Sequence, residues 1–155
     1  MAPILFDGAM GNAGQVCLGV KRIYAPRALV PALGAALVSC AERAVVGDGR
    51  VAGTTIGPVQ NAAQYARLVD LLAEVRAQGR VLHGGAAIEG SGYYIAPTIV
   101  TDLPDAARLV QEEQFGPIIP LLAYDDEAEL VRRVNDGPYG LGASVWTADA
   151  ARGQA

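Results

Sequence analysis

The chain has 155 residues, 52% of them apolar and 18% charged, with a formal net charge of −4. This length and composition suit one folded domain with a buried core rather than a disordered chain. The acidic balance argues against a nucleic-acid partner, which requires a basic surface. No apolar run approaches the roughly 20 residues of a membrane span, and the N-terminus lacks the basic start of a signal peptide. The two cysteines are far apart and no pair has metal-ligand spacing, so we expect a cytoplasmic protein with reduced thiols and no metal.

The first part of the chain predicts a helix, a turn, a strand and a second helix. Residues 3–10 are apolar and form the end of a helix, and the glycine-flexed turn over 11–17 follows it. Residues 20–24 are typical of a strand. Apolar residues recurring every four positions predict a helix over 27–45. Cys40 belongs to its apolar stripe, and we expect it in the core.

The middle of the chain predicts a loop, a long helix and a strand. Residues 46–58 are rich in glycine and threonine, which favours a loop. Asn61 is a good N-cap, with Gln64 three residues on as in a capping box. The helix that begins there ends at Gly79, and residues 80–83 are predicted to form a strand.

The next region alternates short strands with a helix. Residues 93–95 and 98–100 favour strands separated by Pro97. Residues 105–112 predict a short helix, and Gly116-Pro117 separates it from an apolar run over 118–124.

The last region predicts two helices around a strand. Asp125 and Asp126 begin the first helix, whose inward face carries Leu130, Val131 and Val134. Residues 143–147 favour a strand with Trp146 in the core, and another helix begins at Asp149. Strands alternating with helices predict an α/β fold, a layered α/β/α domain with a largely parallel sheet.

Cys17 is the strongest candidate for a functional residue. A cysteine at the mouth of a glycine turn can attack a carbonyl while free backbone N–H groups receive the negative charge. The surrounding sequence Asn12-Ala13-Gly14-Gln15-Val16-Cys17, with Arg22, resembles the catalytic-cysteine signature of aldehyde dehydrogenases. Two further motifs resemble that family in the same order: Glu112-Glu113-Gln114-Phe115-Gly116-Pro117, then Asn135 with Tyr139-Gly140-Leu141 and Ser144-Val145. The resemblance extends over nearly the whole chain.

The resemblance implies oxidation of an aldehyde to a carboxylic acid with NAD or NADP, through a cysteine thiohemiacetal and thioester. Cys17 matches the nucleophile, and its own N–H is a candidate oxyanion donor. Glu113 matches the glutamate that binds the nicotinamide ribose. Phe115, which we expect on the same side of an extended segment, matches the aromatic residue near the nicotinamide. The family is homo-oligomeric and acts on small aldehydes.

The chain also departs from the family pattern. The family's Glu-Leu-Gly-Gly motif, its nucleotide-binding domain and its last segments have no counterpart here, so residues 1–155 resemble the central part of the catalytic domain. We therefore expect no turnover from this chain alone. The mean hydropathy of +0.26 predicts apolar surfaces that are exposed to solvent, and therefore self-association of the chain. The alternative is a non-catalytic remnant or interaction fragment.

Three other interpretations compete with these assignments. Glu112 is expected to be a solvated residue at a helix end. His83, the only histidine, would support a cofactor-independent Cys–His hydrolase if it met Cys17. The spacing of Gly8, Gly11 and Gly14 differs from a dinucleotide loop.

Overall fold

Four strands form one sheet in the order β1-β4-β3-β2. The computed structural model describes residues 1–154. The strands are β1 (Ile23–Pro26), β2 (Arg80–His83), β3 (Thr98–Thr101) and β4 (Ile118–Tyr124). β1, β4 and β3 are mutually parallel, and β2 runs antiparallel to β3 at the far edge. The predicted α/β fold with a largely parallel sheet is confirmed.

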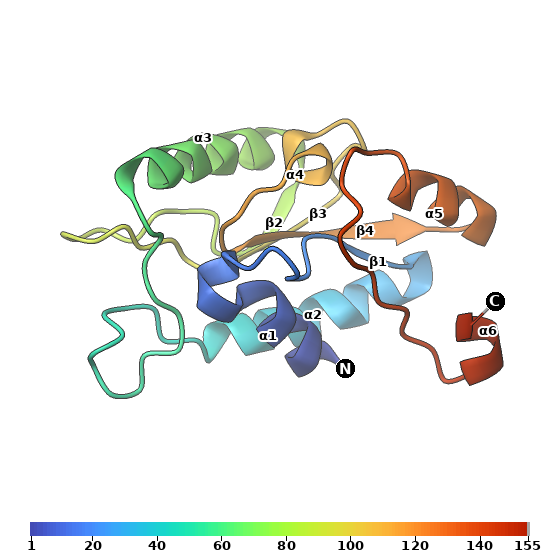
Figure 1. Cartoon of the computed structure of the whole chain (residues 1–155), viewed down its shortest axis with the longest axis horizontal. Helices are drawn as coiled ribbons and strands as arrows, with labels where there is room; N and C mark the ends of the chain where they lie inside the picture. Colours follow the sequence, from blue (N-terminus) through green and yellow to red (C-terminus); the bar gives the residue numbers. More distant parts are fainter. Residues whose placement is uncertain (155) are drawn as a thin grey trace.

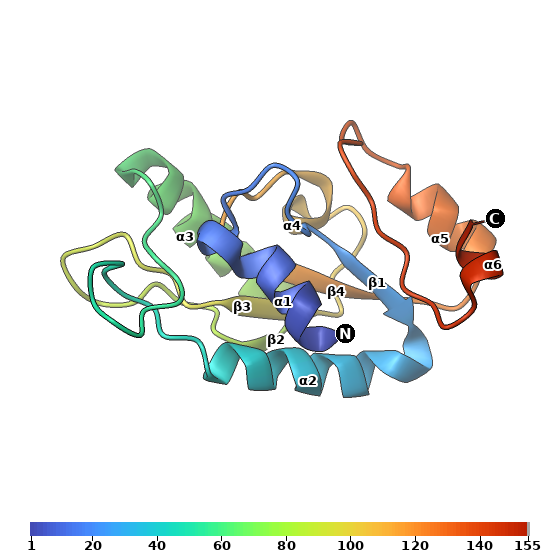
Figure 2. The same cartoon turned by 60° about the horizontal axis from the view of Figure 1, so that its bottom comes forward.

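Helices cover both faces of this sheet (Figures 1 and 2). The α-helices are α1 (Ala2–Met10), α2 (Val30–Glu42), α3 (Ala62–Gln78), α4 (Arg108–Gln111), α5 (Glu127–Val134) and α6 (Ala150–Gln154). Two 3₁₀ turns, η1 (Gly11–Gly14) and η2 (Arg27–Leu29), precede β1 and α2. α1 and α2 lie on one face, and α3 and α4 lie on the other. No helix within residues 1–154 is long and apolar enough to cross a membrane.

The sheet separates two hydrophobic clusters. Side chains alternate along a strand, so Ile119 and Leu121 join the cluster of α1 and α2. Ile118 and Leu122 join the cluster of α3 and α4. The four residues are at most 2% exposed. β4 is therefore an inner strand whose two faces are both buried in the core.

Several predicted elements are confirmed. α3 begins after Asn61, whose Oδ1 accepts a hydrogen bond of 2.9 Å from the Gln64 N–H, and Gly79 follows its end. Cys40 is buried, as predicted. The Gln64 side chain does not complete the capping box. It donates instead to two carbonyls outside the helix.

Other boundaries differ from the sequence-based prediction. β1 begins at Ile23, the first residue paired with β4, instead of residue 20, because the Val20 N–H donates to the Gly8 carbonyl of α1. The predicted helix over 27–45 is divided into η2 and α2 and ends at Glu42. The predicted strand over 93–95 is reduced to one isolated bridge between Ala87 and Ile95.

The C-terminal predictions are wrong in two respects. Residues 143–147 form no strand, because no neighbouring strand pairs with them in the described part of the chain. Trp146 is 44% exposed instead of buried, and Val131 on α5 is 60% exposed. Leu130 and Val134 are half-buried. In Figure 1 this region runs along the outside of the sheet and ends in α6.

Candidate active site

Cys17 and the Glu112–Pro117 segment meet at the edge of the sheet where the parallel strands begin. Cys17 lies shortly before β1, and the second segment lies immediately before β4. Because β1 and β4 are parallel neighbours, the segments before them lie at the same edge. The fold thus brings together two motifs that are almost 100 residues apart.

The turn that carries Cys17 has an unusual backbone. Asn12, Ala13 and Gly14 have φ values of 52°, 55° and 71°, three consecutive left-handed residues. For alanine this conformation costs about 1–2 kcal/mol, and such strain is concentrated at functional sites. Hydrogen bonds from Gln15 N to Asn12 O and from Gly19 N to Val16 O close the turn. The Cys17 thiol is exposed.

The Cys17 N–H is free to receive a ligand. The two hydrogen bonds that close the turn are donated by the N–H groups of Gln15 and Gly19. Within residues 1–154 the Cys17 N–H donates to no acceptor. An exposed thiol beside a free N–H is the arrangement that acyl chemistry needs, since the N–H can stabilise an oxyanion formed by sulfur attack.

Gln15 ties the turn to the loop before α3. Its Nε2 donates to Pro58 O at 3.2 Å, and its Oε1 accepts from Gln60 N at 2.8 Å. The sequence motif contains Gln15, but only the structure shows that this side chain holds the turn in place. No spacing pattern links residue 15 to residues 58 and 60.

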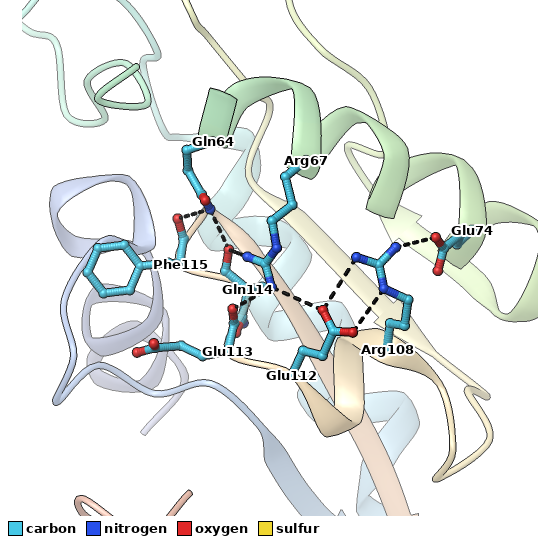
Figure 3. Close-up of polar contacts among 8 residues, drawn as sticks. All are labelled: Gln64, Arg67, Glu74, Arg108, Glu112, Glu113, Gln114 and Phe115. Atoms are coloured by element: carbon cyan, nitrogen blue, oxygen red, sulfur yellow. Dashed lines mark hydrogen bonds and ion pairs between the residues drawn. The ribbon is translucent and has the colours of Figure 1, made fainter. Parts of the chain in front are cut away.

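Helix α3 clamps the second segment by its backbone (Figure 3). Gln64 Nε2 donates to the carbonyls of Gln114 and Phe115 at 2.8 and 3.0 Å. The Arg67 guanidinium donates to the carbonyls of Glu113 and Gln114 at 3.0 and 3.2 Å. Three consecutive carbonyls are thereby fixed by two side chains of one helix.

The sequence predicted an extended segment around Phe115, but the structure shows that the segment is not extended throughout. Phe115 has φ 48°, so the chain turns there before Gly116. Figure 3 nevertheless shows the Glu113 carboxylate and the Phe115 ring on the same side, away from Arg108. The two side chains thus point to the same side, as expected, although the segment is not extended. The chain turns at Phe115, and α3 binds the backbone carbonyls on either side of this turn.

The two adjacent glutamates have opposite surroundings. The Glu112 carboxylate accepts from Arg108 Nε and from Arg67 Nη2, each at 3.1 Å. These hydrogen bonds lower the pKa of Glu112 below its usual value, and the bond from Arg108 has the largest effect. Arg108 also pairs with Glu74. Glu112 thus stands at the end of α4 with its side chain 41% exposed, as predicted, and is in addition bound to two arginines.

The Glu113 carboxylate, in contrast, has no hydrogen bond or ion pair in the described part of the chain; only its backbone carbonyl is bound. It is half-buried beside the half-buried Phe115. A free carboxylate next to an aromatic face fits a ribose diol and a flat heterocycle, because the carboxylate can accept both hydroxyl hydrogens.

Gln114 is the buried link between the two segments. It is 2% exposed. Its Nε2 donates to Ile118 O at 2.6 Å and to Lys21 O at 3.3 Å, while its Oε1 has no partner. Gly14 lies against Gly116 beside it: a Cβ on Gly14 would be 2.2 Å from Gly116 O.

The structure does not bring His83 to Cys17. His83 is on β2, three strand spacings, or about 14 Å, from β1, and its Nδ1 is bonded to Pro97 O at 2.8 Å. The Cys–His hydrolase is therefore not supported by the geometry.

An open cavity of about 500 Å³ lies at the opposite edge, where the parallel strands end. This edge is the usual ligand site in α/β sheets. Here its arginines are already paired, Arg27 with Asp125 and Arg133 with Asp105. The exposed thiol and the free carboxylate are both at the other edge.

Comparisons with known proteins agree on one family. The aldehyde dehydrogenase family profile matches residues 1–155. A probable aldehyde dehydrogenase of a Pseudomonas species is 43% identical over 133 residues, which are 84% of this chain and 27% of that protein. Betaine aldehyde dehydrogenase of Sinorhizobium fredii is 36% identical over 94% of this chain and 31% of its own length.

Solved structures give the same result. Aldehyde dehydrogenase from Bacillus cereus superposes with a TM-score of 0.93 at 32% identity, covering 99% of this chain and 31% of that one. Aldehyde dehydrogenase C from Pseudomonas syringae, determined with NAD+ and octanal, also has a TM-score of 0.93, at 31% identity, with 99% and 32% covered. The chain thus spans about a third of the length of these proteins.

Proposed function

The chain belongs to the aldehyde dehydrogenase family, and on that premise we propose that it is the cysteine-bearing central part of the catalytic domain of an NAD(P)-dependent aldehyde dehydrogenase. Cys17 is its nucleophile, and Glu113 and Phe115 are its cofactor contacts. The observation that carries this proposal is the exposed Cys17 thiol beside its own free N–H, in a turn that packs against the segment of Glu113, the glutamate of the pair that has no arginine partner.

Cys17 performs the bond-forming step. Its thiolate attacks the aldehyde carbon, a C–S bond forms, and the carbonyl electron pair moves to oxygen, where the Cys17 N–H donates to it. Loss of a hydride from that carbon gives the thioester, and water then releases the carboxylic acid and the thiolate. Bound NAD(P)+ supplies the two-electron acceptor that this oxidation requires.

Glu113 and Phe115 would hold the nicotinamide riboside part of that cofactor. The Glu113 carboxylate accepts hydrogen bonds from the ribose hydroxyls. Phe115 offers a half-buried ring held by the Gln64 clamp on its carbonyl. Fixing the 113–115 backbone keeps both side chains oriented before the cofactor arrives, which lowers the entropic cost of binding.

Acyl transfer to Cys17 tests the nucleophile without the cofactor. On treatment with p-nitrophenyl acetate, the chain should release one equivalent of nitrophenolate, and mass spectrometry should locate the acetyl group on Cys17. Cys17→Ala should abolish this release, whereas Cys40→Ala, which removes the buried thiol, should retain it. Equal release from Cys17→Ala and from the wild type would refute the assignment.

A non-catalytic interaction fragment is the second candidate. It is favoured by exposed apolar residues in the C-terminal region: Val131, Tyr139, Leu141, Val145 and Trp146. Under this candidate the chain acquires no acetyl group at Cys17 above the level of an unstructured thiol peptide. Under the first, acylation exceeds that level, although we expect no NAD(P)-dependent turnover from residues 1–155 alone.

A further inference from the structure

Lys21 lies between the Cys17 turn and the Glu113–Phe115 segment. It is half-buried just before β1. Its Nζ donates to the Gly14 carbonyl at 2.8 Å, and the same ammonium lies 5.1 Å from the centroid of the Phe115 ring. One side chain thus touches the backbone of the nucleophile turn and the aromatic ring of the second segment.

The groups that act electrostatically on Lys21 belong to the candidate active site: Glu113 and Cys17. Burial lowers the pKa of Lys21 below its usual value, because the partly desolvated ammonium is disfavoured. Glu113, and then Cys17, act in the opposite direction. The ammonium therefore experiences both the free carboxylate and the thiol.

The backbone of Lys21 is also bound. Its carbonyl accepts from Gln114 Nε2, so residue 21 contacts the second segment through main chain and side chain. In the strained turn, the Gly14 carbonyl belongs to the last of three left-handed residues. Its direction fixes the path of the chain from residue 14 to Cys17.

We propose that Lys21 is a positioning residue, which joins the Gly14 carbonyl to the Phe115 ring and thereby fixes the turn that presents the Cys17 N–H. This rests on the proposed function of Cys17. The Gly14 hydrogen bond orients the turn, and the cation–π contact, worth about 0.5–2 kcal/mol, ties it to the second segment.

The test compares two reactions of the same thiol in a Cys40→Ala background. In acylation by p-nitrophenyl acetate, a C–S bond forms, nitrophenolate leaves, and an oxyanion develops on the way. In alkylation by iodoacetamide, a C–S bond forms and iodide leaves with no oxyanion. Thiolate fraction and exposure affect both rates, so the ratio of acylation to alkylation reports the oxyanion donor.

Lys21→Met should lower this ratio about tenfold, less than the 10²–10³ typical of removing an oxyanion donor. Lys21→Arg keeps the charge and the cation–π contact and should restore most of it. The matched control is Arg76→Met, which removes a cation that donates to another loop carbonyl, that of Gly85, and should leave the ratio unchanged. An unchanged ratio in Lys21→Met overturns the proposal, as does an equal fall in Arg76→Met.

A second variant tests the same contact from its other side. Phe115→Leu keeps an apolar side chain but removes the cation–π partner, and should lower the ratio about threefold, within the range that this contact supports. If Lys21→Met does not fold, Phe115→Leu still tests the proposal. An unchanged ratio of acylation to alkylation in Phe115→Leu argues against Lys21 acting through Phe115. Failure of the wild type to acylate at Cys17 refutes the proposed function itself, and the Lys21 role falls with it. Acylation that is normal in every variant refutes the Lys21 role alone.

Discussion

Gly14 and Gly116 lie so close together that neither segment of the site can move independently. A Cβ on Gly14 would be 2.2 Å from the Gly116 carbonyl oxygen and 2.5 Å from its carbon. A Cβ on Gly116 would in turn meet the buried side chain of Leu68 at 2.4 Å. The Cys17 turn therefore rests on the Glu112–Pro117 segment, which rests on α3.

Gly14→Ala should damage both stability and reactivity. The added Cβ meets backbone, which cannot yield as a flexible side chain can, and φ 71° disfavours alanine. We expect a loss of about 2 kcal/mol or more in the free energy of unfolding, measured by urea denaturation, and slower acylation of Cys17. Gly11→Ala is the control, because its Cβ would meet nothing within 4 Å. Equal stability of the two variants would contradict the close packing.

Glu113→Gln should weaken binding of nicotinamide mononucleotide by about tenfold or more, because a hydrogen bond to a charged group contributes roughly 1.5–3 kcal/mol. Saturation-transfer NMR of the ribose protons measures it. Glu112→Gln should bind the nucleotide as the wild type does, since that carboxylate faces Arg67 and Arg108. Alkylation of Cys17 should be the same in both. Unchanged nucleotide binding in Glu113→Gln would remove this residue from the site.

Glu112 should instead contribute to stability in a pH-dependent way. Its pKa is lowered from 4.5 by Arg108 and Arg67. The stabilisation is therefore present above pH 4.5 and is lost as the pH falls below it. Glu112→Gln should reduce the melting temperature at pH 7 by no more than about 2–4 °C, since the pair is partly exposed. This difference should shrink at pH 3, whereas a difference that is constant with pH would argue against the ion pair.

Trp146 reports on the C-terminal region, because it is the only tryptophan. At 44% exposure its fluorescence in dilute solution should be that of a solvated indole, quenched readily by acrylamide. Self-association through the exposed apolar residues should shift the emission to shorter wavelengths as concentration rises. Emission typical of a buried indole that persists on dilution would show that this region packs against its own domain.

Elements with strong local signals could be predicted from the sequence. α3 was predicted from its apolar period, its Asn61 cap and its terminal Gly79, all of which act within a few residues. β4 coincides with the apolar run over residues 118–124, which the sequence marks as an apolar segment without assigning it a strand. Cys17, Glu113 and Phe115 were selected by motif, and the fold brings their segments to one edge.

The remaining features depend on contacts that no local pattern contains. Lys21 and Phe115 are neighbours only because β1 and β4 pair in parallel. Glu112 is exposed at a helix end as predicted, but its ion pair with Arg67 joins residues 45 apart on different helices. The expected strand over 143–147 has strand-forming residues but no partner strand, and hydrogen-bonded pairing, more than propensity, decides whether a strand forms.

The parallel pairing of β1 with β4 also sets the order in which the chain can acquire its chemistry. Cys17 is synthesised before the Glu112–Pro117 segment, against which its turn packs, although Gln15 can already bond to the loop at residues 58 and 60. Until that segment is made, the turn lacks its packing against Gly116 and the Lys21 contact with Phe115. Closing so long a loop costs chain entropy that only the completed sheet offsets. The backbone around Cys17 therefore reaches its final packing only when β4 has paired with β1.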